Sequence, residues 1–98
     1  MLIKVFPIGL KPGTQAAAER IVEKFTPRGP QQEAGTLSFR VYRDPAKADY
    51  LLFVEHFADQ AAYDAHTSSA AYDELIRGEF GALIAEWNEI DHELFVSA

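Results

Sequence analysis

The stretch GTLSFRVYRDPAKADYLLFVEHF, from Gly35 to Phe57, reads as two consecutive strands joined by a short turn. Its first half alternates, with Leu37, Phe39 and Val41 on one face and more polar side chains on the other. The pair Asp44-Pro45 closes that strand, and only a few residues separate it from the second apolar run. This spacing predicts a tight antiparallel hairpin.

One helix is predicted on each side of the hairpin. Residues 14–25 carry apolar side chains at helical spacing, with Thr14 as the predicted N-cap. A second helical region begins with Asp59 as N-cap, breaks near Ser68 and continues to Trp87. Strands are predicted at both ends of the chain, at residues 2–10 and 88–98.

The resulting order of elements is β-α-β-β-α-β. This order is typical of one α+β domain with a ferredoxin-like antiparallel sheet and both helices on one face, here over residues 1–98. A single layer of helices leaves the other face open, where we expect the bulky side chains Phe6, Tyr42, Phe53 or Val54, and Phe95. We therefore expect a homodimer.

Charge and composition exclude several classes of partner. The chain has 9 basic and 15 acidic residues, a net charge of −6, and no Lys or Arg after Arg77. Such a surface repels phosphate backbones, so we expect no nucleic acid partner. No apolar run approaches the ~20 residues that cross a bilayer, and the N-terminus does not resemble a signal peptide, so we expect a cytoplasmic protein without a membrane partner.

Two motifs carry a resemblance to a known family. EAGTLSFRVYRDP begins with Glu-x-Gly before the first hairpin strand, and YLLFVEHFADQAAYDAHTSSAAYDEL combines a strand with a histidine that precedes a Ser-rich helix restart. Together they resemble the antibiotic biosynthesis monooxygenase family, over nearly the whole chain. The resemblance implies a dimeric α+β barrel with a pocket between sheet and helices in each subunit.

Members of this family include cofactor-independent oxygenases of quinols and anthrones, and also haem-degrading enzymes. The haem-degrading branch resembles this chain poorly. That branch has an Asn on the first strand and a Trp in the second helical region, whereas this chain has Phe6 and His66 at those positions. The resemblance therefore implies oxidation of a quinol or related hydroxylated aromatic rather than haem degradation.

Oxygenation without a cofactor needs an apolar slot, a base near the phenol and exclusion of water. His66 is the candidate base, because an imidazole titrates near neutrality. Tyr63 lies three residues before it and could face the same pocket, as could Tyr72. The alternative for His66 is a histidine that only interacts with a helix C-terminus, and both tyrosines could serve packing alone.

The predicted substrate-binding residues are mainly aromatic. They are Phe39, Phe53, Phe57, Phe80 and Arg77. Arg77 could hold an anionic substrate or be a solvated helix residue. Glu55 shares a face with Phe53 and Phe57, so it is either an acid of the pocket or the partner of Arg40 or Arg43 on the adjacent strand, and the ion pair is favoured. His56 is expected to face the partner subunit.

No metal or organic cofactor is expected. The three histidines, at positions 56, 66 and 92, lack the short spacings of metalloenzymes, and no Gly-rich strand-to-helix loop is present for a flavin or nicotinamide. Two hypotheses remain. The first is a cofactor-independent monooxygenase that binds a small aromatic substrate. The second is a non-catalytic or isomerase-type dimeric α+β barrel that binds a small hydrophobic ligand.

Overall fold

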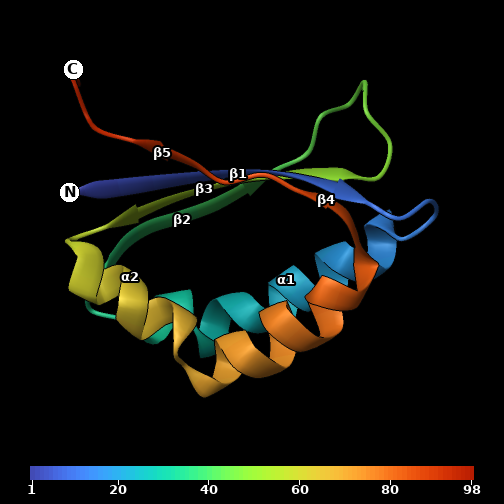
Figure 1. Cartoon of the computed structure of the whole chain (residues 1–98), viewed down its shortest axis with the longest axis horizontal. Coiled ribbons are helices and arrows are strands. Elements are labelled where there is room, and N and C mark those ends of the chain that lie inside the picture. Colours follow the sequence, from blue (N-terminus) through green and yellow to red (C-terminus); the bar gives the residue numbers. More distant parts are fainter.

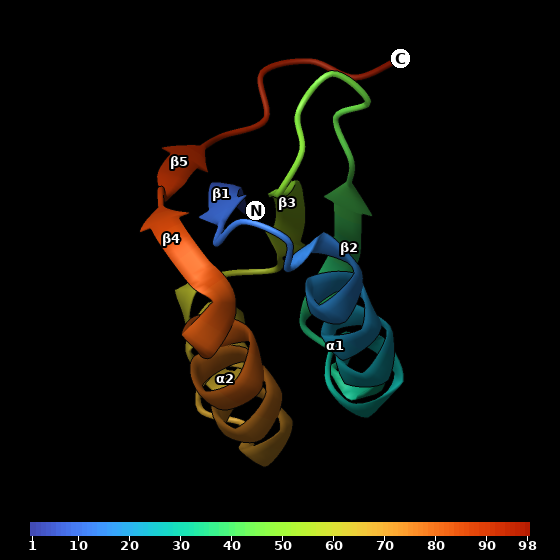
Figure 2. The ribbon, with the colours of Figure 1, turned by 90° about the vertical axis from the view of Figure 1, so that its right-hand side faces the viewer.

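A computed structural model describes all residues from 1 to 98 and has two layers, a sheet and the helices that cover one of its faces (Figures 1 and 2). The elements follow the predicted order, and they are β1 (Leu2–Leu10), α1 (Gln15–Arg28), β2 (Thr36–Tyr42), β3 (Tyr50–Phe57), α2 (Gln60–Thr67), a π-helix (Tyr72–Phe80), β4 (Ile84–Trp87) and β5 (Ile90–His92). Short 3₁₀ turns follow α1 and the π-helix, at Pro30–Gln32 and Gly81–Leu83.

The sheet is antiparallel throughout, with the strand order β2-β3-β1-β4. β4 and β5 pair with the same edge of β1. β4 pairs with residues 8–10 of β1, and β5 pairs with residues 3–5. The predicted β2–β3 hairpin, the ferredoxin-like α+β fold and the placement of the helices on one face are confirmed. None of the helices has both the length and the apolar character that crossing a bilayer requires.

The last strand differs from the prediction. The helix ends before Ile84, the sheet edge is formed by two short strands, and residues 93–98 adopt no regular structure. Asn88 lies at the break and donates its side-chain N–H to the carbonyl of Pro7 on β1, 3.1 Å away. Because Pro7 has no N–H to offer a neighbouring strand, regular pairing is interrupted at this point.

One aromatic residue was assigned to the wrong face of the sheet. Phe6 was expected on the open face but is buried in the core beneath the helices. Of the alternatives Phe53 and Val54, Val54 lies on the open face and Phe53 faces the helices. The sequence LIKVFPIGL of β1 is apolar at both odd and even positions, so its alternation could not decide which side meets the helices.

Leu37 also departs from the expected alternation. The pairing of β2 with β3 shifts between Thr36 and Ser38, and Leu37 becomes exposed rather than sharing a face with Phe39 and Val41. A bulge of this kind places an extra residue in one strand and redirects the chain. It lies where the segment that carries Glu33 enters the sheet.

The start of α1 is capped from a distant loop. Thr14 makes no capping side-chain hydrogen bond; instead the Asp49 carboxylate accepts the backbone N–H groups of Gly13, Thr14 and Gln15 at 3.1–3.3 Å. Asp49 adopts a positive φ of 53° to reach them. The cap predicted at Asp59 is confirmed, since its carboxylate accepts the N–H of Ala62 at 2.9 Å.

Candidate functional site

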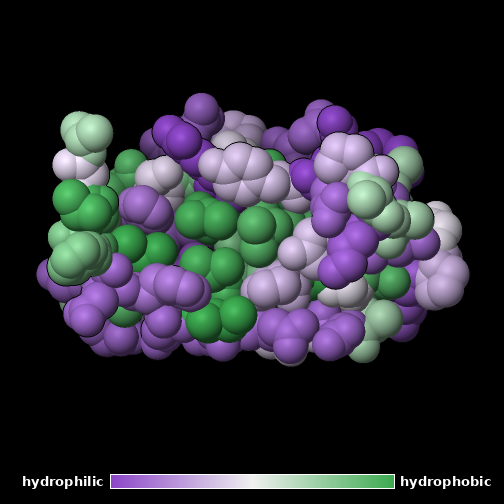
Figure 3. Space-filling view, turned by 90° about the horizontal axis from the view of Figure 1, so that it is seen from above, coloured by the Kyte–Doolittle hydropathy of each residue, from purple (hydrophilic) through white to green (hydrophobic).

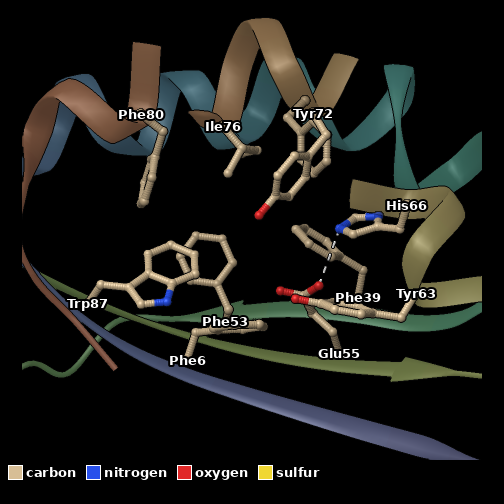
Figure 4. A pocket seen from close by; sticks show the side chains of 11 residues that line it. Phe6, Phe39, Phe53, Glu55, Tyr63, His66, Tyr72, Ile76, Phe80 and Trp87 are labelled. Carbon is tan, nitrogen blue, oxygen red and sulfur yellow. Dashed lines mark ion pairs between the residues drawn. The ribbon is translucent and has the colours of Figure 1, made fainter. Parts of the chain in front are cut away.

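A pocket lies between the sheet and the helices, in the middle of the hydrophobic core (Figure 4). Its cavity volume is about 20 Å³, enough for about one water molecule, while the hollow counted with the gaps between side chains and its opening to solvent is about 350 Å³. Aromatic rings form most of its wall, and Glu55 and His66 are the lining residues with ionisable groups apart from two tyrosines. The full lining consists of Phe6, Phe25, Phe39, Phe53, Glu55, Tyr63, His66, Tyr72, Ile76, Phe80 and Trp87.

The π-helix provides one wall of the pocket. Tyr72, Ile76 and Phe80 project from it at intervals of four residues (Figure 4). Gly81, directly after the π-helix, has little room for a side chain, because a Cβ atom there would lie 3.3 Å from the carbonyl oxygen of Ile76. A π-helix is uncommon, and such distortions are frequent at functional sites.

His66 lies in the last turn of α2 and is almost completely buried, with 1% of its surface exposed. Its Nδ1 is 2.7 Å from Oε1 of Glu33, and its Nε2 is 3.4 Å from Oε1 of Glu55. The rings of Phe57 and Tyr72 pack against the imidazole, with centroid separations of 5.1 and 5.3 Å. His66 is therefore the centre of a buried group with one carboxylate at each ring nitrogen.

The electrostatics of this group favour retention of a proton. Burial alone would lower the pKa of His66, but the carboxylates of Glu55 and Glu33 raise it above its usual value. Burial raises the pKa of Glu55, an effect that His66 partly offsets. Since each ring nitrogen faces a carboxylate oxygen, the favoured state near neutrality is an imidazolium. This imidazolium donates Nδ1–H to Glu33 and forms an ion pair through Nε2 with Glu55 on the pocket wall.

Two hydroxyl groups from the helical side share the pocket with Glu55. Tyr63 projects from α2 and Tyr72 from the π-helix, and Figure 4 shows the Tyr72 hydroxyl directed into the cavity toward Glu55. Burial raises the pKa of both tyrosines. Both hydroxyls therefore stay protonated and can donate hydrogen bonds to an oxygen of a bound molecule.

The other sequence-predicted site residues are divided between the pocket and its surroundings. Phe39, Phe53 and Phe80 line the pocket as expected. Phe57 is fully buried but lies behind the site, against the rings of Tyr63 and His66. The exposed Arg77 is outside the lining; its guanidinium lies 4.9 Å from the Tyr72 ring centroid and donates to the carbonyl of Thr67.

Glu55 has a different partner from the one expected. It shares the helix-covered face with Phe53 and Phe57, as predicted, but it meets His66 and not an arginine. Arg43 instead pairs with Glu19 on α1, with nitrogen–oxygen distances of 2.7 and 2.8 Å. Its place in the pocket lining agrees with the other possibility, an acid of the pocket, for which a carboxylate on an apolar strand face was the signal in the sequence.

Several residues of the site were not predicted. Glu33 was noted only as part of a motif, and four apolar lining residues were not assigned to the pocket, namely Phe6, Phe25, Ile76 and Trp87. His56 and His92 lie away from His66, opposite Ile3 on the two neighbours of β1. No group of three or more His, Asp or Glu side chains is placed to hold a metal ion.

Residues 1–78 match the antibiotic biosynthesis monooxygenase family. The fold is similar to a crystal structure of an antibiotic biosynthesis monooxygenase, with a TM-score of 0.87, 18% identity, and coverage of 98% of this chain and 100% of the other. It is also similar to PA3566 from Pseudomonas aeruginosa, with a TM-score of 0.86, 22% identity, and coverage of 97% and 94%. Identities this low show a shared fold alone. No curated protein matches the sequence.

Proposed function

Because the chain belongs to the antibiotic biosynthesis monooxygenase family, we propose that it oxidises a quinol or related hydroxylated aromatic with dioxygen, without a cofactor. The observation that carries this proposal is the buried pair of Glu55 and His66 on the wall of an otherwise aromatic pocket. An apolar slot with one proton acceptor suits a flat substrate that carries an acidic hydroxyl.

In the proposed reaction the substrate supplies all the electrons. A para-quinol loses its phenolic protons, gains one oxygen atom on the ring and becomes a hydroxyquinone, while the second oxygen atom leaves as water. Deprotonation starts the sequence, because the phenolate gives an electron to dioxygen far more readily than the phenol does. The protein needs to bind the ring, accept the proton and keep bulk water away.

The pocket residues have distinct roles in this scheme. The Glu55 carboxylate accepts the phenolic proton, since both nitrogens of His66 already face carboxylates. His66 stabilises the charge on Glu55 before the transfer. The hydroxyls of Tyr63 and Tyr72 donate to the oxygen anion that forms, and the phenylalanine rings hold the aromatic body of the substrate. Glu55 thus takes the role for which His66 was the sequence-based candidate.

Oxygen uptake by the purified protein tests the proposal. A panel of quinols and hydroxynaphthalenes is supplied in air-saturated buffer, with metal analysis of the same preparation. We expect uptake of one dioxygen per substrate oxidised, with a rate above the spontaneous one. Ligand binding without any uptake over the panel would contradict this function and favour the alternative, a barrel that binds a small hydrophobic ligand.

A further inference from the structure

Glu33 contacts the buried site without lining the pocket. It lies in the segment between α1 and β2, and its Oε1 is 2.7 Å from Nδ1 of His66. The same oxygen accepts a hydrogen bond from the hydroxyl of Thr36 at 2.8 Å. Its second carboxylate oxygen, Oε2, is buried and has no hydrogen-bond partner.

The backbone that carries Glu33 is held against α2. A Cβ atom on Gly35 would lie 2.5 Å from the Cβ of Ala62, so only glycine allows this approach. The carbonyl of Gly35 also accepts the N–H of Ala58, at 2.9 Å, just before α2 begins. Since His66 is on α2, these contacts fix the position of Glu33 relative to the imidazole.

Burying these charged groups costs free energy of desolvation, so a contribution to stability alone does not explain the arrangement. A buried ion pair is often no more stabilising than apolar residues of similar volume, and a buried carboxylate oxygen without a partner carries a desolvation cost. Here the buried His66 and Glu55 and the largely covered Glu33, whose side chain is 18% exposed, come together inside a core that is otherwise apolar. A role for Glu33 in the chemistry of the site accounts for the retention of this charge.

We propose that Glu33 is a positioning residue, which holds Nδ1–H of His66 so that the Nε2 side of the ring faces Glu55 in the pocket wall. The proposal rests on the proposed function for its catalytic consequence, but not for its effect on His66. A carboxylate on the far nitrogen fixes the ring orientation and favours the imidazolium, as in other acid–base sites in which a third group orients a histidine.

The side chains around the His66 imidazole come from several helices and strands. Glu33 and Glu55 are the charged ones, and the hydroxyl-bearing rings of Tyr63 and Tyr72 pack beside the imidazole. α1 and β2 contribute only phenylalanine rings. On β1, Lys4 lies opposite Glu55 in register, but its ammonium binds two other carboxylates, Glu89 at 3.1 Å and Asp91 at 2.8 Å.

The test compares Glu33→Gln with Glu23→Gln, which removes the same charge from an exposed position on α1. The titration of His66 is followed by NMR of protein with ¹⁵N-labelled histidine, with the His66 resonances assigned from their absence in His66→Ala. We expect Glu33→Gln to move the midpoint of His66 to lower pH, and Glu23→Gln to leave it in place. Equal midpoints in the two variants would overturn the proposal.

Kinetics with an accepted quinol provide a second readout. We expect Glu33→Gln to lower kcat by about 10- to 100-fold with little change in KM, because Glu33 does not touch the pocket. A higher KM with unchanged kcat would contradict a positioning role. If the wild-type protein oxidises no quinol, the proposed function fails, and the NMR titration still decides the role of Glu33.

A second variant, Thr36→Val, tests the proposal if the Glu33→Gln protein does not fold. Thr36→Val removes the second hydrogen bond to Oε1 of Glu33 and keeps both charges of the His66 pair. We expect the same direction of change in the His66 midpoint and in kcat, with a smaller size. No change in either quantity, in a folded Thr36→Val protein, would also count against the proposal.

Discussion

The most informative residue is Glu55, because it is both an acid of the pocket wall and a neighbour of a buried imidazole. Its side chain is hidden among aromatic rings, where a carboxylate is a stronger base than in water. Because the rate of general base catalysis increases with the pKa of the base, such a carboxylate removes a phenolic proton more effectively. A solvent-exposed glutamate that pairs with an arginine would have no such advantage.

Glu55→Gln preserves the shape of this side chain and removes its ability to accept a proton. We expect turnover to fall by about 10²- to 10⁴-fold, the usual range for a positioned acid or base. We expect His66→Ala to lower turnover by an amount in the same range, since Glu55 and His66 act together. Oxygen uptake under substrate saturation measures both, with Glu23→Gln as the control. Wild-type turnover in Glu55→Gln would assign the proton acceptor elsewhere.

The buried pair also makes stability depend on pH. His66 has a raised pKa in the folded protein, so its contribution to stability is complete below the unfolded value of 6.5 and is lost as the pH rises through the folded value. Glu55, also raised, acts in the same direction. The surface carboxylate of Glu19 titrates at about 2, because Arg43 lowers its pKa, and does not contribute in this range.

We therefore expect the free energy of unfolding to decrease as the pH rises above 6.5 and through the raised folded pKa of His66. Urea denaturation at constant ionic strength measures this change. The double variant Glu55→Gln/His66→Gln removes both ionisable groups of the pair. Its free energy of unfolding should therefore change less with pH over the same range. A wild-type stability that rises with pH would show that the pair does not hold the proton.

At the level of elements, α1 depends on a residue that lies outside the helix. Asp49 closes the β2–β3 hairpin and accepts three N–H groups at the start of α1, while the Gln15 side chain bonds both backbone groups of Tyr50. The hairpin and the helix are thereby joined at one end of the molecule. The predicted cap, Thr14, bonds only the carbonyl of Lys11 through its hydroxyl.

Asp49→Gly removes this cap without backbone strain, because glycine readily adopts the positive φ found there. We expect a loss of about 1–2 kcal/mol in the free energy of unfolding, from the lost cap and the greater freedom of the unfolded chain. Thr14→Ala, in the same turn, should change stability by no more than about 0.5 kcal/mol. Thermal and urea unfolding of the two variants make the comparison. A larger loss in Thr14→Ala would contradict capping by Asp49.

Elements with a local signal were predictable from the sequence, and those that depend on distant contacts were not. The alternation around Phe39 and Val41 identified β2, and Asp59 marked the start of α2 correctly. The facing direction of Phe6 was not encoded locally, since β1 is apolar on both sides. The candidate site was predictable only in part, because some of its contacts join residues that are distant in the sequence. Glu33 and His66 meet only after folding, 33 residues apart in the chain.

For the whole molecule, the open face of the sheet is a surface that no helix covers. It carries exposed or half-buried apolar side chains from three adjacent strands, among them Val5, Leu52, Val54 and Ile90, and Figure 3 shows hydrophobic residues gathered on this side. Continuous apolar surface of this kind is typical of an interface. We propose that a second copy of the chain covers it, as the fold leaves no helix for that purpose.

We expect a homodimer with a total buried area above about 2,000 Å². Sedimentation equilibrium at micromolar concentration should give about twice the monomer mass of 10.9 kDa. Val54→Asp places a charge in the open face and should dissociate the dimer, whereas Ala16→Asp, on the exposed side of α1, should not. A stable wild-type monomer would contradict this assembly.

Trp87 gives the pocket a spectroscopic property. It is the only tryptophan in the chain, it lines the pocket, and its ring packs against Phe6 with a centroid separation of 5.1 Å. Light that excites only tryptophan therefore produces emission from one place, at the edge of the binding site. A quinone is an efficient quencher at short range. Because the Trp87 ring is 43% exposed and also meets quinone from solution, the saturable part of the loss of emission on titration reports occupancy of the pocket, without label or turnover.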